Sequence, residues 1–312
     1  MLGRIVEITG EGRRLSLHRG FLEISGPDGV LGQVPLDDIE AVIASSPAIS
    51  YSNQALTALA ERGAPVVICG RNFAPSALLL PIDGHHAQGE RFEAQAAAKL
   101  PVRKRLWAEI VRAKVTAQAA ALERVGADPL PLRFLLSRVR SGDTGNIEAQ
   151  AAQKYLPAMF GGGFRRDRDA DGINAALNYG YTVLRAATAR SIVAAGLHPS
   201  LGLHHVSKGS SLRLADDLME PFRPTVDIVV HDLLRSSEAI ALDPPTKRKL
   251  AGVLHADFAS SEGASPLSNV LTRCAQSLTQ VFMGERQRLA WPLSLVPLSA
   301  AAEAGAINSN ND

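Results

Sequence analysis

Cysteine is scarce in this chain, and long apolar runs are missing from it. The 312 residues include 2 cysteines, Cys69 and Cys274, which lie far apart in the sequence. They exclude a disulfide framework and suit a reducing compartment, so we expect a cytoplasmic protein. No stretch of about 18 apolar residues occurs, and the start MLGRIVEITG lacks the charged and apolar regions of a secretory signal. We therefore expect no membrane segment.

The charge of the chain is nearly balanced but unevenly distributed. The formal net charge is +2, with six Lys and Arg against nine Asp and Glu in residues 1–85, and 27 against 22 in residues 86–312. Most affinity for DNA comes from Lys and Arg contacts with phosphates, so the second part is the expected DNA-binding part. For any single residue, solvation of an exposed helix face is the simpler interpretation. The basic stretch on one long predicted helix consists of Arg103, Lys104, Arg105, Arg112 and Lys114. The candidate DNA contacts are Arg103, Lys104, Arg112, Arg138, Arg165, Arg166 and Lys208.

Residues 1–83 predict a small β-rich domain. Two apolar runs, IEAVIAS and PVVICG, flank a predicted helix at 52–62 and indicate one β-α-β excursion. The polar segment 84–90 is the expected linker, and His85 and His86 are interpreted as linker residues rather than ligands. Four short strands separated by glycine-containing turns, typical of a meander or sandwich, are expected at Arg4–Ile8, Arg14–His18, Phe21–Ile24 and Val30–Val34.

Beyond the linker, helical periodicity predicts a larger all-α domain at 91–290, so the expected fold class is α+β with two domains. The segment Gly161–Gly172 is a predicted loop that either contacts DNA or only connects helices. Residues 291–312 show no periodicity and are an expected frayed tail. The expected helices are Val102–Val125, Leu132–Arg140, Asn146–Phe160, Gly172–Ala195, one from Leu218 onward, Lys247–Phe258 and Leu267–Leu289.

The stretch from Gly196 to Pro224, with one glutamate upstream of it, carries side chains that suit a hard metal ion. Asp217 and Glu220 stand three residues apart in ADDLME and would share one face of a helix. His205 ends LGLHH, an expected strand or extended segment, and the loop after it can return the imidazole to these acids. Glu148 follows an expected helix start at Thr144–Asn146 and faces the core, where an unpaired carboxylate costs on the order of several kcal/mol.

These donors are carboxylate oxygens and one imidazole nitrogen, which favours Mg2+ or Mn2+ over structural zinc. A zinc site built from His198, His204 and His205 is the weaker alternative, because neither cysteine lies near them to complete four ligands. The acids could also serve only in salt bridges. The candidate salt bridges are Asp217 or Glu220 with Arg213 or Arg223, and Glu148 with Lys154 or Arg140.

Three motifs carry a family resemblance. GNIEAQAAQKY, NYGYTVLRAATARSIVAAGLHPSLGLHH and LADDLMEPFRP occur in an order and spacing that resemble CRISPR-associated protein one, the integrase of spacer acquisition. The resemblance runs from about Gly3 to about Arg286 and is closest to members from single-effector, type II-like systems. It implies a divalent-metal site of Glu148, His205 and Glu220. Asp217 remains an alternative third ligand, and His205 is either a ligand or a proton carrier.

The resemblance also implies a reaction and partners. The 3′-hydroxyl of a DNA fragment would attack a phosphodiester at the edge of a CRISPR repeat, in a transesterification that needs Mg2+ or Mn2+. The implied assembly is a homodimer through the β-domain, with a second small CRISPR-associated protein bridging two dimers and the RNA-guided effector nuclease as a further candidate partner. Two other hypotheses stay open: a catalytically silent DNA-binding scaffold, and a zinc hydrolase that uses the three histidines.

Overall fold

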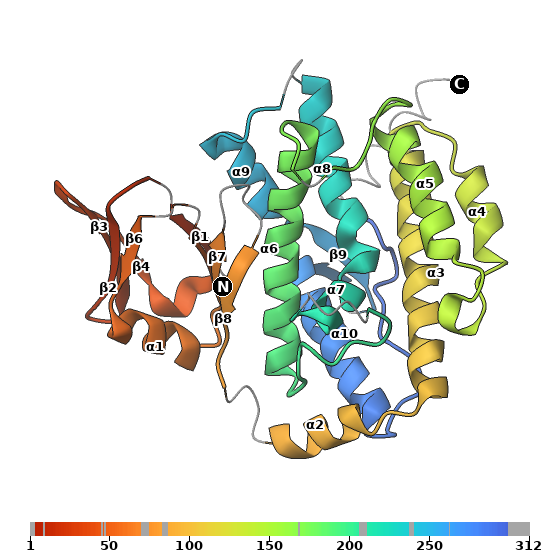
Figure 1. The fold of residues 1–312 in the computed structure, drawn as a ribbon, viewed down its shortest axis with the longest axis horizontal. Coiled ribbons are helices and arrows are strands. Elements are labelled where there is room, and N and C mark those ends of the chain that lie inside the picture. Colours follow the sequence, from red (N-terminus) through yellow and green to blue (C-terminus); the bar gives the residue numbers. More distant parts are fainter. Residues whose placement is uncertain are drawn as a thin grey trace. The chain divides into compact units, whose positions relative to one another are not determined.

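The computed structural model shows a strand-rich unit, Met1–His86, followed by a mostly helical unit, Ala87–Asp312 (Figure 1). It describes residues 4–8, 10–44, 46, 48–69, 75–82, 87–167, 169–205, 211–236, 240–261 and 263–298. The expected α+β fold class, β-rich first and helical afterwards, is confirmed. No helix in these ranges is both long enough and apolar enough to cross a membrane.

Two four-stranded sheets form the first unit. In the sheet β4-β3-β2-β6, the expected antiparallel meander consists of β2 (Arg13–His18), β3 (Phe21–Gly26) and β4 (Gly29–Pro35), and β6 (Ile49–Tyr51) pairs in parallel with β2. The first strand does not join it, because β1 pairs in parallel with β5 instead. The second sheet has the order β1-β5-β7-β8, with β1 at Arg4–Ile8, β5 at Ile39–Ala44, β7 at Val66–Cys69 and β8 at Pro75–Leu79.

The expected β-α-β excursion is present in that second sheet. Strands β5 and β7 are parallel neighbours, and α1 (Asn53–Glu61) connects them by way of β6. Ser52 caps α1, since its hydroxyl accepts a hydrogen bond from the Ala55 amide at 3.2 Å. A short 3-10 turn, η1, covers Leu36–Asp38. Leu15, Leu22 and Leu59 are among the buried residues of this unit's core.

The second unit is built around α3 (Leu100–Arg124) and α6 (Ile173–Ala194). Helix α3 is buried on most of its circumference and contacts α4, α5 and α8, whereas α6 contacts α8, α9 and α10 (Figure 1). The other helices are α2 (Gln88–Ala96), α4 (Leu130–Leu136), α5 (Ile147–Phe160), α7 (Arg213–Leu218), α8 (Arg223–Ser236), α9 (Pro244–Ala251) and α10 (Leu267–Phe282). Three short 3-10 turns are η2 (Ser141–Asp143), η3 (Glu220–Phe222) and η4 (Gly252–His255).

A helix was expected to run on from Leu218, but α7 ends there. Pro221 has no amide hydrogen to continue the helical bonding, and its ring is incompatible with the carbonyl four residues earlier. The chain therefore passes through η3 before α8 begins at Arg223. As a result, Asp217 and Glu220 do not share the face of one helix.

The second unit was expected to be all α, but it also contains two strands. Strands β9 (Asp257–Ser260) and β10 (Gly263–Pro266) form an antiparallel hairpin where the end of a helix was predicted. The ring of Phe258 lies in the core 6.2 Å from that of Phe222. Helix α10 ends at Phe282, before Gly284, which adopts a positive φ of 78°.

Part of the segment expected to fray packs on the helical unit. Within residues 291–298, the Trp291 ring lies 6.2 Å from that of Phe222, and the Leu293 amide donates to the Ala259 carbonyl. Val296 is buried. The remaining residues of this segment, 299–312, lie outside the described residues.

Gly180 in the middle of α6 allows that helix to approach α8 closely. A Cβ atom at this position would lie 2.4 Å from Cγ1 of Val226. We predict that Gly180→Ala lowers the free energy of unfolding by about 1–2 kcal/mol, because overpacking outweighs the gain in helix propensity. Gly89→Ala in α2 is the matched control, since nothing lies within 4 Å of its Cβ position. Equal stability of both variants in chemical denaturation would contradict the close packing of α6 on α8.

Candidate active site

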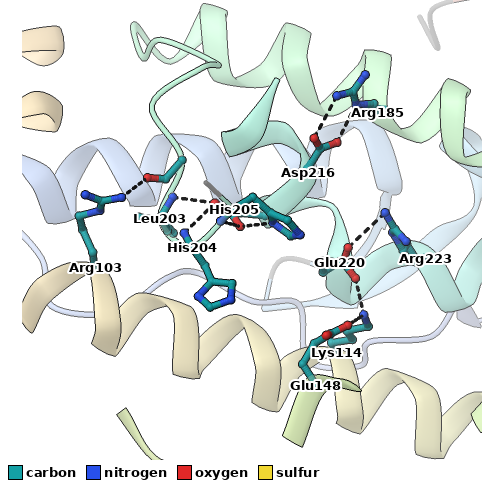
Figure 2. A network of polar contacts seen from close by, with 12 residues as sticks. Arg103, Lys114, Glu148, Arg185, Leu203, His204, His205, Asp216, Glu220 and Arg223 are labelled. Carbon is teal, nitrogen blue, oxygen red and sulfur yellow. Dashed lines mark hydrogen bonds and ion pairs between the residues drawn. The ribbon is translucent and has the colours of Figure 1, made fainter. Parts of the chain in front are cut away.

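Asp217 organises the loop that carries the histidine. Its carboxylate accepts hydrogen bonds from the backbone amides of Leu203 (2.6 Å), His204 (3.1 Å) and His205 (3.2 Å) and from Nδ1 of the His205 ring (2.6 Å) (Figure 2). These four bonds occupy both oxygens of a fully buried side chain. Asp217 therefore fixes the backbone of the loop and the orientation of the His205 ring.

The Asp217 contact also defines the chemistry of His205. An ionised carboxylate accepts only, so Nδ1 carries a proton and Nε2 is the atom that can bind a ligand or exchange a proton. The hydrogen bond to Asp217 raises the pKa of His205, and it outweighs burial, which lowers it. Residues 199–205 form turns and bends here, not the strand that was expected.

Two further side chains, from outside the loop, hold its backbone in place. The Gln95 amide from α2 donates to the carbonyls of His198 and Leu201 at 3.0 Å each and accepts from the His198 amide at 2.8 Å. Arg103 donates to the Gly202 carbonyl at 2.8 Å (Figure 2). A Cβ atom on Gly202 would lie 3.0 Å from Oδ2 of Asp217, so a larger residue would disturb the same carboxylate.

The three histidines of the zinc hypothesis are engaged separately. His198 accepts the Ser200 amide on Nδ1 at 3.2 Å, and its ring meets the Phe92 ring edge-on. The ring of His204 stacks flat on Trp107, with centroids 4.2 Å apart. His205 is bound to Asp217. This arrangement gives no support to a zinc site made from these imidazoles.

Glu148 lies in the first turn of α5, which Asp143 holds in place. The two carboxylate oxygens of Asp143 accept the amides of Ile147 and Glu148, each at 2.9 Å. The helix start was expected at Thr144–Asn146, but the side chain that binds the first amides comes from η2 instead. Glu148 thereby projects from a fixed helix end.

Lys114 lies between Glu148 and Glu220, as Figure 2 shows. Its ammonium contacts Oε1 of Glu148 and lies 2.5 Å from Oε2 of Glu220. Arg223 completes the set, with Nη2 at 3.2 Å from Oε1 of Glu220. Burial would raise the pKa of Glu220, but Arg223 and Lys114 outweigh it and the pKa is lowered. Burial would likewise lower the pKa of Lys114, but Glu220 and Glu148 raise it.

A buried polar cluster supports Arg223 from behind. Its guanidinium lies 4.8 Å from the centre of the Tyr181 ring. The hydroxyls of Tyr181 and Tyr155 donate to Asp227 at 2.5 and 2.9 Å. Burial raises the pKa of Asp227 to about 6, although both tyrosine hydrogen bonds act to lower it.

The carboxylates fit a divalent cation by the chemistry of their donor atoms. Oxygens of Glu148 and Glu220 already contact one common positive charge, and carboxylate oxygen with imidazole nitrogen suits Mg2+ or Mn2+. In the described part of the chain, however, no three His, Cys, Asp or Glu side chains are gathered closely enough to hold a metal. The two carboxylates are assembled around an ammonium group, and His205 belongs to the same electrostatic cluster.

The salt bridges considered from the sequence are present in part. Glu220 pairs with Arg223 as one alternative had it, but the partner of Glu148 is Lys114, not Lys154 or Arg140. Lys114 had been assigned to the basic DNA-binding stretch, yet it is buried. The neighbour of Asp217, Asp216, pairs with Arg185 of α6 at 2.6 Å (Figure 2).

The candidate DNA contacts differ in their surroundings. Lys104, Arg138 and Arg165 are exposed. Arg103 and Arg166 form internal hydrogen bonds, the former to the histidine loop and the latter to Asn174 and Asn178 of α6. Exposed Arg112 donates to the Val139 carbonyl at 2.6 Å. Lys208 lies outside the described residues.

Sequence reasoning missed Lys114, Asp143, Gln95 and Trp107 as parts of this site. Lys114 carried a signal, because it lies four residues after Ile110 and beside Val111 and Val115, on the apolar side of its helix. Asp143 also carried a local signal, because it lies just four and five residues before the amides that it binds at the start of a helix. Gln95 and Trp107 contact residues about a hundred positions away, and nothing local to them indicates which group they meet.

Comparisons with known proteins give consistent matches. The family described as "CRISPR associated protein Cas1" matches residues 6–140 and 145–257. The "CRISPR-associated endonuclease Cas1" of Neisseria meningitidis serogroup C (strain 8013) is 42% identical over 247 residues, which are 78% of this chain and 81% of that protein.

Solved structures share the fold. A casposase bound to integration product superposes with a TM-score of 0.81 at 20% identity, covering 99% of this chain and 100% of that one. A chain of a "Cas6-RT-Cas1--Cas2 complex" gives a TM-score of 0.75 at 19% identity, covering 94% of this chain and 36% of that one. At these identities the likeness concerns the fold.

We predict that Asp217→Asn loosens the histidine loop. The new amide group places a donor where an oxygen now accepts backbone amides, and an unsatisfied buried amide costs about 1–3 kcal/mol. Hydrogen exchange at residues 203–205 is expected to become faster. Asp216→Asn is the control, since Asp216 pairs with Arg185. Equal protection of these amides in wild type and Asp217→Asn would contradict the positioning role.

We further predict a pH-dependent stability term from Asp227. Its pKa of about 6 in the folded chain lies above the usual value near 3.9, so the folded chain keeps this proton to higher pH. Stability from Asp227 is therefore present below about pH 4 and is lost as the pH rises through about 6. Relative to wild type, Asp227→Asn is expected to gain on the order of 3 kcal/mol of unfolding free energy between pH 4 and 7. If the difference in unfolding free energy between Asp227→Asn and wild type, measured by chemical denaturation, stays constant across this pH range, the assignment is contradicted.

Proposed function

This chain belongs to the CRISPR-associated Cas1 family, and on that premise we propose that it is a metal-dependent DNA endonuclease and integrase of CRISPR adaptation. The observation that carries the proposal is that Glu148 and Glu220 both contact one cationic group, the ammonium of Lys114. They come from separate elements, α5 and η3, and His205 lies in the same cluster. Such an arrangement is expected where a divalent ion acts on a phosphodiester.

Glu148, Glu220 and Nε2 of His205 would hold the metal, which we propose to be Mg2+ or Mn2+. When bound, a divalent ion polarises a phosphoryl oxygen and offsets the negative charge of the transition state. Asp217 orients the imidazole and is not a ligand in this proposal, because both of its oxygens are already engaged. The contacts of the two acids thus favour Glu220 over Asp217 as the third ligand.

The reaction is an exchange of phosphodiester bonds. The 3′-oxygen of an incoming fragment forms a bond to a phosphorus atom at the repeat edge, and the bond from that phosphorus to the 3′-oxygen of the repeat strand breaks. The proton of the attacking hydroxyl leaves, and the departing oxygen takes up a proton. In the alternative to its role as a metal ligand, His205 carries a proton. Its raised pKa favours a protonated ring, and Nε2 of that ring can protonate the departing oxygen.

We assign DNA contacts to the exposed basic residues of the helical unit, Lys104, Arg112, Arg138 and Arg165. Exposed cations bind phosphates without reading sequence. Arg103 and Arg166 are better explained as residues that hold loops, because they donate to Gly202 and to α6. Lys208 stays a sequence-based candidate.

We propose a homodimer formed through the strand-rich unit, with a second small adaptation protein bridging two dimers. Among the solved structures of similar fold, one is a complex that includes Cas1 and Cas2, and another is a complex of Cas1 with DNA. Both support protein and DNA partners of this kind for the present chain. The RNA-guided effector nuclease is a further proposed partner.

Glu148→Gln tests this function. We predict that transfer of a labelled fragment into a repeat-containing plasmid falls at least about 100-fold, since a metal site loses an anionic ligand. Binding of the same DNA is expected to persist. Glu123→Gln is the control, because Glu123 is exposed and pairs with Arg133. Unchanged transfer by Glu148→Gln would rule out this active site, absent transfer in the wild type would favour a silent scaffold, and stoichiometric zinc without DNA activity would favour a zinc hydrolase.

A further inference from the structure

Lys114 is a buried cation at the centre of the helical unit that the proposed reaction does not use. It lies on α3, and its ammonium contacts carboxylates from α5 and from η3. A lysine is rarely buried unless it is paired. Here it has two acidic partners, and they are the two carboxylates of the proposed metal site.

The contacts leave little room for a second cation while Lys114 stays in place. Oε1 of Glu220 pairs with Arg223, and Oε2 pairs with Lys114. Oε1 of Glu148 also contacts Lys114. An ion that binds both carboxylates must therefore displace one of these two basic groups.

Lys114 is the group that can move. The planar guanidinium of Arg223 lies against the Tyr181 ring, which donates to buried Asp227, so its position is fixed from several sides. Lysine instead carries a compact charge at the end of a flexible four-carbon stem. A change of rotamer can move the ammonium away from its position between Glu148 and Glu220, so that it contacts only one of the two carboxylates.

The side-chain exposures indicate the approach of the ion. Glu148 is 29% exposed, whereas Glu220 is 5% exposed and Lys114 is 7% exposed. An ion arriving from solvent meets Glu148 first. It reaches Glu220 only when the ammonium between them gives way.

We propose that Lys114 is a built-in competitor of the divalent ion: it neutralises the Glu148–Glu220 pair in the metal-free protein and is displaced when the ion binds. This inference rests on the proposed metal site. It adds that the affinity for the ion is weakened by competition with an internal ammonium group, and that the metal-free site is held in an ordered, charge-balanced state.

Lys114→Met tests the competition, with Mn2+ as the probe and binding measured by calorimetry on the full chain. Without the ammonium, Glu148 and Glu220 attract Mn2+ without competition from Lys114, while Arg223 stays paired with Glu220. The dissociation constant is expected to fall at least about 10-fold. In thermal unfolding, the variant is expected to be less stable than wild type without Mn2+ and to gain more from adding it. Lys154→Met, an exposed lysine on α5, is the matched control.

The outcomes separate this inference from the function on which it rests. Unchanged or weaker Mn2+ binding by Lys114→Met, with binding still abolished by Glu148→Gln, would overturn the competitor role and leave the metal site standing. Mn2+ binding that is insensitive to Glu148→Gln would remove the site and the competition together. If Lys114→Met folds only with Mn2+, the inference is supported. If it does not fold at all, Lys114→Gln, which keeps a hydrogen-bond donor without the charge, is judged by the same dissociation constant.

Discussion

The ammonium group of Lys114 joins three elements that lie far apart in the sequence. Packing α5 and η3 against α3 brings half-buried Glu148 and buried Glu220 together, and without a cation the two carboxylates would repel each other. Lys114 removes that conflict, and Arg223 stabilises Glu220 from the other side. The same ion cluster therefore links three elements of the helical unit and contains the two carboxylates of the proposed metal site.

Three acids within five residues perform different tasks because the helix ends between them. Asp216 pairs with α6, Asp217 holds the histidine loop, and Glu220 faces α3. Pro221 is the cause, since an uninterrupted helix would have kept Asp217 and Glu220 on neighbouring positions of one face. The break after α7 therefore separates Asp217, which orients the His205 imidazole, from Glu220, which contacts the Lys114 ammonium.

The sequence was sufficient for most of the framework, but not for the contacts that bring the candidate site residues together. Periodicity located the long helices, and turn residues located most strands of the first unit. The candidate ligands came from a family resemblance, and the structure brings Glu148 and Glu220 together. Local patterns could not show that Lys114 is buried between two acids or that β1 pairs with β5, because each depends on segments tens of residues away.

Asp143 has a consequence for how a nucleic acid can meet this site. The first amides of a helix carry partial positive charge and commonly bind anions. At α5 the amides of Ile147 and Glu148 already donate to the Asp143 carboxylate, so that end of the helix dipole is compensated from within the protein. In the proposed complex, attraction for the sugar–phosphate backbone beside Glu148 would then come from cationic side chains and from the proposed metal ion, not from the peptide dipoles.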